Sequence, residues 1–284
     1  MFRFTIECCL FAVIMFATSF IWPMYLLQND RYQHRVAGSE IYRSLKKSRT
    51  STASTVILGD SVGNQIFDNR QIDRRFDSLA CNQAISLAGQ YVLMEEVIAN
   101  NPNIKNIALL IHPSTLCNNL DQIYTFHYFV KPFMTPKYSA YMSDQVRSQV
   151  QKIPFAQYAR VPQILTSNWA PTYDVPQRTG LSAIAKVYFA KIVALAKQHN
   201  IRFELVSPPI SEKFRDDFNT LDFGPLSEAN EQALNDYLSN LEYVCDEEFL
   251  DGVHLCDPVA TREACWNEIS ESLLLDDETV EVAE

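Results

Sequence analysis

The segment 55–63 constrains the fold of this 284-residue chain more than any other. It begins with the β-branched, apolar run Thr-Val-Ile-Leu and breaks at Gly59 into Gly-Asp-Ser-Val-Gly. The run predicts a buried strand, and the glycine permits a sharp turn directly after it. A helix is expected near 64–74, with Asp60 capping it or ordering the turn. Ser61 therefore stands where a strand gives way to a helix, at the edge where α/β sheets bind their ligands.

Strand and helix patterns alternate along the rest of the chain. Further strands are expected near 82–86, 106–111 and 201–206, and further helices near 90–100, 180–199, 227–241 and 259–274. Alternation of this kind predicts a parallel sheet with helices on both faces. The fold class is therefore α/β, in three α/β/α layers.

A second motif, Asp251-Gly-Val-His254, places an acid three residues before a base. A serine hydroxyl is a poor nucleophile until an imidazole takes its proton, and a carboxylate fixes the tautomer of that imidazole. Either motif alone is weak, because both also occur in ordinary turns. Together they predict a serine-nucleophile enzyme in which Ser61 attacks, His254 is the base and Asp251 orients it.

The two motifs resemble blocks I and V of the SGNH (GDSL-like) hydrolases and acyltransferases. Residues 82–90, Asn-Gln-Ala-Ile-Ser-Leu-Ala-Gly-Gln, resemble block II, whose glycine amide contributes to the oxyanion hole. The resemblance implies that Gly89 takes this role beside the amide of Ser61, and that 54–275 form a flavodoxin-like catalytic domain. It is closest to membrane-anchored members that handle acyl groups on cell-envelope polymers, such as the DltD-like and alginate-acetylation proteins.

Block III is where the chain departs from that family. Members carry Gly-x-Asn-Asp after the third strand, whereas residues 112–119 here read His-Pro-Ser-Thr-Leu-Cys-Asn-Asn. We expect Asn118 to supply the missing oxyanion donor, with Asn119 or Ser114 as alternatives. His112 would end a strand near the site and is a candidate substrate contact.

Two alternatives stand beside this interpretation. The string Gly59-x-Ser61-x-Gly63 also fits the nucleophile elbow of the α/β-hydrolase fold, but that fold needs several strands before the elbow. The other alternative is not an enzyme. A catalytically degenerate SGNH-like scaffold, lacking block III, would bind a glycan or a membrane acyltransferase partner.

Residues 1–27 are predicted to be a membrane anchor. The stretch 4–25 is nearly continuous apolar sequence, long enough to span a bilayer, and it ends with the interface aromatics Trp22 and Tyr25. A cleaved signal peptide is the alternative. The basic residues after the segment would keep the domain cytoplasmic. The family resemblance instead implies a single-pass anchor with the catalytic domain on the periplasmic, extracytoplasmic side.

Three further segments are set apart by composition. Residues 28–53 read as a polar linker, and 276–284 as a solvated acidic tail. Residues 118–178 are rich in aromatics and prolines and interrupt the alternation. They are predicted to form a lid or acceptor groove on which sugar rings stack, with Tyr128 as a candidate contact, and local core packing is the alternative.

Composition also bounds the partners. A net charge of -10 without a basic patch argues against nucleic acid. No metal and no cofactor is expected, because Cys-x-x-Cys is absent and the histidines lack ligand spacing. An exported domain permits disulfides, for instance Cys245 with Cys256 or Cys265. The expected partners are an acylated glycan or envelope polymer, the membrane, and a multi-spanning acyltransferase.

Overall fold

The computed structural model describes residues 2–28, 38–159 and 180–273. The four main strands form one parallel sheet in the order β2-β1-β3-β4. Their bounds are Thr55–Gly59 (β1), Asp77–Ser78 (β2), Asn106–Leu110 (β3) and Arg202–Val206 (β4). Gly59 pairs with Leu110, and Leu110 with Val206. The three long strands therefore end at one edge, and the segments that follow them meet there.

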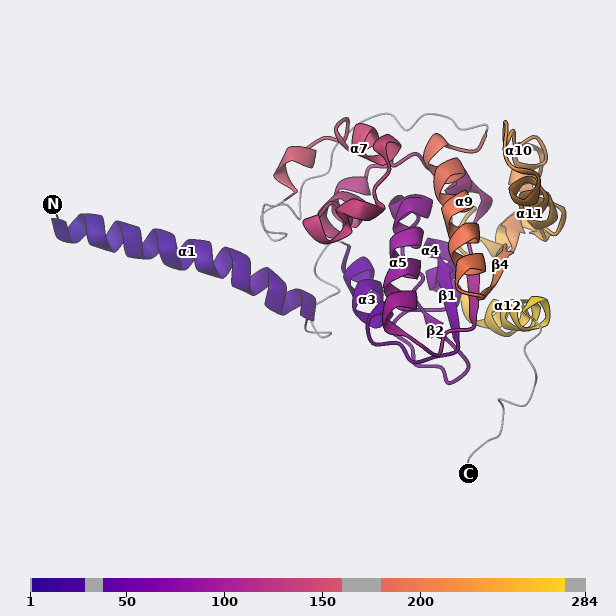
Figure 1. Ribbon diagram of the computed structural model, residues 1–284, viewed down its shortest axis with the longest axis horizontal. Coiled ribbons are helices and arrows are strands. Elements are labelled where there is room, and N and C mark those ends of the chain that lie inside the picture. The colour runs from indigo at the N-terminus through magenta and orange to yellow at the C-terminus, as the bar shows by residue number, and fades with distance from the viewer. Residues whose placement is uncertain (1, 29–37, 160–179, 274–284) are drawn as a thin grey trace, which may run out of the picture.

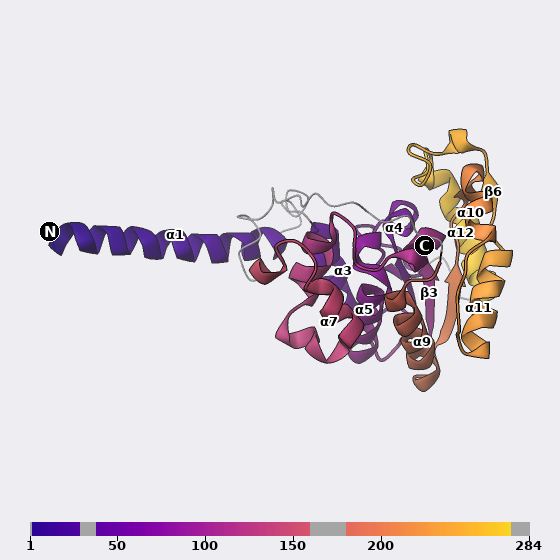
Figure 2. The same ribbon diagram turned by 90° about the horizontal axis from the view of Figure 1, so that it is seen from above.

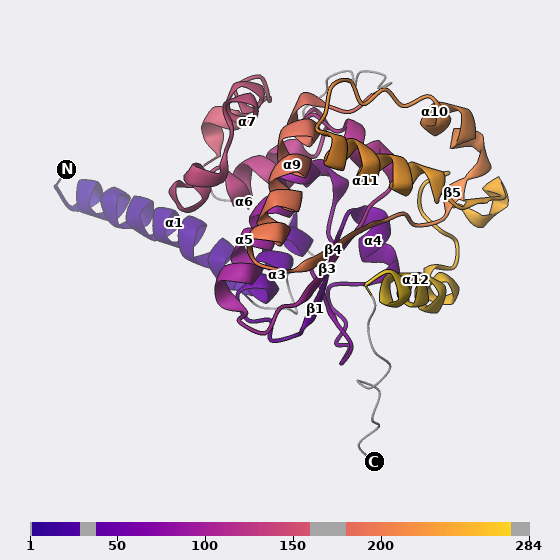
Figure 3. The same cartoon turned by 45° about the vertical axis from the view of Figure 1, so that its right-hand side comes forward.

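Helices cover both faces of this sheet (Figure 1). One layer contains α3 (Ser39–Ser48), α5 (Ser86–Asn100), α9 (Ala183–Gln198) and α11 (Glu228–Ser239), and the other α4 (Ser61–Ile66) and α12 (Pro258–Ser272). Val56 and Leu58 of β1 pack into the core of the first layer, whereas Ile57 packs into the second. This alternation is what a strand between two helical layers requires. The expected α/β class with a parallel sheet is confirmed, and Figure 3 shows the layers on either side of the sheet.

Short elements complete the described chain. They are η1 (Gln83–Ile85), η2 (Pro113–Cys117), η3 (Phe126–Val130), α6 (Lys131–Phe133), η4 (Pro136–Tyr141), α7 (Asp144–Val150), η5 (Ala156–Tyr158), β5 (Ile210–Ser211), η6 (Glu212–Phe214), α10 (Arg215–Asn219), β6 (Tyr243–Val244) and η7 (Asp246–Glu248). Strands β5 and β6 pair in parallel as a separate two-stranded sheet. It lies at the end of the molecule farthest from α1 (Figure 2).

The strand predicted near 82–86 is wrong. The side chain of Asn82 accepts the backbone N–H of Ala84 at 2.9 Å, which closes the 3-10 turn η1. Ser86 has a φ of 51° and begins α5. The sheet position beside β1 is filled instead by β2. The helix expected near 64–74 also differs, because it starts at the turn itself and ends at Ile66.

The linker predicted over 28–53 is wrong in its second half, where the structure has α3. Ile41 and Leu45 lie one helical turn apart and are both buried in the core shared with α5. Polar residues on the other face of α3 gave this segment its linker-like composition. Residues 29–37 of the predicted linker and the acidic tail 276–284 lie outside the described residues.

The predicted aromatic insert, 118–178, also lies only partly within the described residues. In the described part, Phe126, Phe129 and Phe133 are fully buried in the main core, which favours core packing over a lid for these side chains. Residues 160–178 of the predicted lid lie outside the described residues. None of the seven cysteines, all within the described residues, forms a disulfide, so neither suggested disulfide is present.

Helix α1 (Phe2–Gln28) covers the stretch 4–25 that we expected to cross a bilayer, and it extends away from the sheet and its layers (Figures 1 and 2). Within the described ranges, no helix combines the length and the apolar character that crossing a membrane requires.

A buried carboxylate ties the insert to the first helical layer. Glu96 of α5 accepts a hydrogen bond from Arg49 at 2.8 Å and another from Lys137 at 2.6 Å. Burial by itself raises the pKa of Glu96, but the bonds from Lys137 and Arg49 outweigh it and hold that pKa below its ordinary value.

We predict that Glu96→Gln lowers the free energy of unfolding by about 1–3 kcal/mol at neutral pH, because two charged donors lose their ionic acceptor. A carboxyl whose folded-state pKa is lowered stabilises the fold above its unfolded pKa of about 4.3, and this contribution is lost as the pH falls through the folded-state value. Urea unfolding at pH 7 and near pH 3 should show the difference from wild type shrinking in acid. Glu271→Gln, at an exposed position of α12, is the control. An equal difference at both pH values would contradict the prediction.

Candidate active site

A single buried carboxylate organises the edge of the sheet. Asp60 caps α4, where one of its oxygens accepts the backbone N–H groups of Val62 at 2.9 Å and Gly63 at 3.2 Å. Its other oxygen accepts the N–H of His112 at 2.7 Å and the hydroxyl of Thr115 at 2.6 Å. The capping role expected for Asp60 is confirmed. The same side chain also joins the turn after β1 to the turn after β3.

Two glycines let α4 lie this close to β3. A Cβ atom on Gly59 would come within 2.5 Å of the carbonyl oxygen of Leu110, and one on Gly63 within 2.7 Å of the same oxygen. Neither distance is compatible with a side chain. The glycines of the Gly-Asp-Ser-Val-Gly string are therefore needed to present Ser61 at the edge of the sheet.

The structure brings Ser61, His254 and Asp251 together. The hydroxyl oxygen of Ser61 lies 3.1 Å from Nε2 of His254, and Nδ1 of that ring lies 2.8 Å from a carboxylate oxygen of Asp251. Both distances allow hydrogen bonds. The group is open to solvent, because 34% of the His254 side chain and 57% of the Asp251 side chain are exposed.

The loop carrying these two residues is shaped by Asp251 itself. Its second carboxylate oxygen accepts the backbone N–H groups of Val253 at 2.9 Å and His254 at 2.8 Å. Gly252 between them has a φ of 85°, which a glycine adopts without strain. Desolvation raises the pKa of Asp251, but the hydrogen bonds from His254 and Val253 have the larger opposite effect. The net result is a pKa well below the usual range of an aspartate. The carboxylate therefore stays ionised beside the imidazole.

Gln65 is a positioning residue that sequence reasoning missed. Its amide nitrogen donates to the carbonyl of Leu255 at 2.8 Å, and its oxygen accepts the N–H of Leu255 at 2.9 Å. This two-way contact fixes the residue after His254 against α4. Its signal was its position, because a side chain four residues after Ser61 lies on the same helical face.

The side chains of two predicted oxyanion donors, Asn118 and Ser114, bond other groups in the structure. The amide nitrogen of Asn118 donates to the carbonyl of Gln83, and its oxygen accepts the N–H of Leu120 at 2.8 Å. Asn118 therefore braces the loop after β3, and this geometry does not support it as an oxyanion donor. Ser114 bonds the ring of His112 instead, while the side-chain oxygen of Asn119 is buried without a partner among the described residues.

Gly89 and Tyr128 lie in helical segments. Gly89 belongs to the first turn of α5, packed so closely on Ile85 that an added Cβ would lie 2.5 Å from it. Its role in the oxyanion hole stays a prediction. Tyr128 lies against Glu40 and Tyr124, and burial raises its pKa to about 12. It does not line the cavity beside the triad, so its predicted substrate contact has no support.

A cavity of about 250 Å³ adjoins the loop that carries Asp251 and His254, which with Ser61 are called the triad below. Val253, which lies between Asp251 and His254 in the chain, forms part of its wall, and so does His112 at the end of β3. Phe214 and Phe218 stand opposite, with ring centroids 5.8 Å and 5.3 Å from that of His112. His112 therefore shares a cavity with the loop that carries His254, and its contact with substrate stays a prediction.

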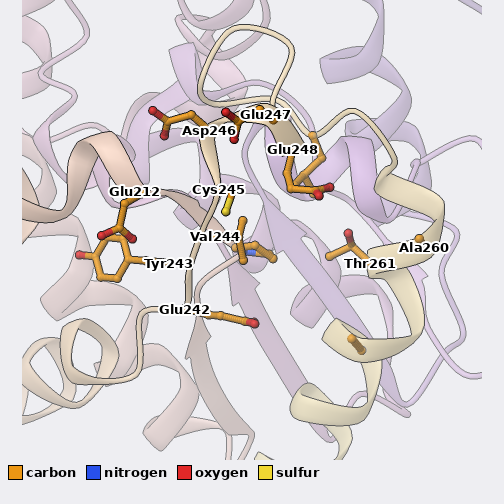
Figure 4. Close-up of a pocket in the computed structure, with 13 residues that line it drawn as sticks. Glu212, Glu242, Tyr243, Val244, Cys245, Asp246, Glu247, Glu248, Ala260 and Thr261 are labelled. Carbon is orange, nitrogen blue, oxygen red and sulfur yellow. The ribbon is translucent and has the colours of Figure 1, made fainter.

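A larger cavity, of about 810 Å³, is shown in Figure 4. Its walls carry the carboxylates of Glu212, Glu242, Asp246, Glu247 and Glu248, and the triad side chains are not among its lining residues. Volume alone therefore does not mark the reacting centre. Over the ranges that the structure describes, no three histidine, cysteine or acidic side chains gather closely enough to hold a metal ion.

Comparisons with known proteins do not assign the chain to a family. No family model matches it, and no curated protein does. A solved structure described as "a putative platelet activating factor from Streptococcus pneumonia" is similar at 12% identity and a TM-score of 0.33, over 88% of this chain and 97% of that one. At this level the likeness carries no argument.

We predict that Gln65→Ala slows reaction of Ser61 with a fluorophosphonate probe by about 10- to 100-fold, because small displacements of a base from its nucleophile cost rates of this order. Labelling rates on the full-length chain measure this. Gln232→Ala, an exposed glutamine of α11, is the matched control. An unchanged rate in Gln65→Ala would show that the clamp does not position His254.

Proposed function

We propose that this chain is a serine esterase or O-acyltransferase of SGNH type, acting on acyl esters of a cell-envelope glycan or polymer. The observation that carries the proposal is the continuous relay of Ser61, His254 and Asp251, with contacts of 3.1 Å and 2.8 Å. These residues come from opposite ends of the domain, and a structural role requires no such alignment.

The proposed reaction follows from the positions of these groups. Ser61 attacks the acyl carbonyl, and its proton passes to Nε2 of His254. Ionised Asp251 holds the ring and stabilises its charged form. The alcohol leaves with the proton from His254, and the acyl group remains on Ser61. Water or a sugar hydroxyl then releases it, so hydrolysis and transfer share this intermediate.

The shape of the site supports a bulky carrier with a small acyl group. The triad side chains are partly exposed, so that an ester on a large polymer can reach Ser61. The adjoining cavity, at about 250 Å³, lies below the roughly 300–1,000 Å³ of sites for drug-sized ligands.

The proposal also includes a membrane anchor, residues 1–27, with the catalytic domain on the extracytoplasmic side. This part rests on the sequence. Phe4, Leu10 and Phe16 of α1 are more than half exposed and need an apolar environment. A membrane acyltransferase would be a fitting partner for transfer. Recovery of the full-length chain in the soluble fraction after cell lysis would remove this part of the proposal.

We predict that Ser61→Ala lowers ester turnover by several orders of magnitude, since it removes the attacking oxygen. Turnover is measured on aryl acetates and acetylated oligosaccharides, and fluorophosphonate labelling should disappear. Ser239→Ala, at the exposed end of α11, is the matched control. Turnover in Ser61→Ala equal to that of the wild type would reject Ser61 as the nucleophile, whereas no turnover by the wild type would favour the non-catalytic glycan-binding scaffold. Free acid as the only product in the presence of an acceptor glycan would exclude transfer.

A further inference from the structure

His112 holds a buried hydrogen-bond donor that bonds none of the residues described by the structure. Its Nδ1 accepts the backbone N–H of Ser114 at 3.2 Å and lies 2.7 Å from the Ser114 hydroxyl. A nitrogen that accepts carries no proton, so the proton of the neutral ring is on Nε2. Nε2 is buried, and no residue that the structure describes bonds it. The side chain is 1% exposed, and its ring forms part of the 250 Å³ cavity. An orphan donor at such a cavity indicates a ligand that brings an acceptor.

The position of this donor relates it to the nucleophile. Because Gly59 pairs with Leu110, Ser61 and His112 each follow the last paired residue by two positions on neighbouring strands. Asp60 fastens both turns, through the N–H groups of Val62 and His112. Ser61 and His112 therefore lie at the same edge of the sheet, and Val253, the neighbour of His254 in the chain, lines the cavity together with His112.

The surroundings of His112 keep it neutral. Burial lowers the pKa of His112 to about 3, and the nearby His254 lowers it as well. A neutral N–H stabilises negative charge that develops on an oxygen without losing its proton to it. It offers no ion pair to a carboxylate, so the group it receives is uncharged.

We propose that Nε2–H of His112 donates to the carbonyl oxygen of the acyl group attacked by Ser61, and that the cavity holds the remainder of a short, uncharged acyl group such as acetyl. The inference rests on the proposed function and specifies its acyl group. Phe214 and Phe218 form the apolar wall against the acyl carbons.

Acylation of Ser61 proceeds through one tetrahedral intermediate. As the bond from the Ser61 oxygen to the carbonyl carbon forms, the π electrons move to the carbonyl oxygen and the serine proton moves to His254. The His112 hydrogen bond strengthens on that oxygen. When the C=O bond re-forms, the bond to the leaving alcohol breaks and the proton from His254 goes to that alcohol. His112 ends as it began, with its proton.

Replacing His112 tests the donor in the full-length chain. His112→Phe should lower kcat for an aryl acetate by about 100-fold with KM nearly unchanged, the loss typical of one oxyanion donor. His112→Gln keeps an N–H and should recover part of this loss. His199→Phe, an exposed histidine after α9, is the matched control. A folded His112→Phe protein with kcat close to wild type would overturn the proposal.

Two further measurements do not depend on how the His112 variants fold. In ¹⁵N-histidine-labelled wild type, the Nε2 resonance of His112 should shift when a phosphonate on Ser61 places an oxygen where the oxyanion forms, and an unmoved resonance would refute the donor. Phe218→Ala should enlarge the cavity and raise the octanoate-to-acetate rate ratio at least tenfold. An unchanged ratio would refute the acyl pocket.

Failure of this inference is separable from failure of the proposed function. If Ser61→Ala abolishes turnover while His112→Phe does not change kcat, the enzyme stands and the donor is wrong. If Ser61→Ala keeps full turnover, the proposed serine mechanism itself is wrong.

Discussion

The carboxylate of Asp60 is the interaction on which the site depends. Its four donors come from two turns that follow different strands, β1 and β3. Burial raises the pKa of Asp60, and the bond from Thr115 and those from the backbone act in the opposite direction. A side chain that satisfies four donors in the interior has few replacements, because any uncharged group leaves some of them unpaired. Ser61 and His112 are consequently placed by one group.

The layered fold could be predicted because local patterns decide it. The runs that form β1 and β3 are mostly apolar and fully buried, as strands between two helical layers must be, whereas β4 at the edge of the sheet begins with the exposed Arg202. The helices α5, α9 and α12 are long, with 15, 16 and 15 residues. Asp251 and His254 could be assigned because their geometry is local, with Gly252 supplying the positive φ that the turn requires. Their approach to Ser61 was a hypothesis from chemistry, and the structure places them within hydrogen-bonding distance of one another.

The failures share another cause. Asn82 and Ser86 form a capped turn where a strand was predicted, because side-chain hydrogen bonds to the backbone compete with sheet pairing. Asn118 was predicted to be an oxyanion donor from its residue type. Its side chain instead bonds the backbone of Gln83, which lies 35 residues away in sequence, and that of Leu120 in the same loop. Composition alone does not reveal which polar group a neighbouring turn will claim. Gln65 escaped notice for the same reason, since its partner lies 190 residues away.

Two imidazoles, those of His254 and His112, lie at the edge of this sheet. Their side chains are chemically identical, so their different surroundings give them different roles. His254 is one-third exposed and holds a carboxylate on one nitrogen and the serine on the other, an arrangement suited to taking and returning a proton. His112 is buried beside Phe214 and Phe218, and its Nε2 has no hydrogen-bond partner among the residues that the structure describes. A proton carrier needs an ionic partner and solvent nearby, whereas a fixed donor needs neither. Pairs of titratable groups held in such different environments are how one site provides both a base and a neutral electrostatic stabiliser.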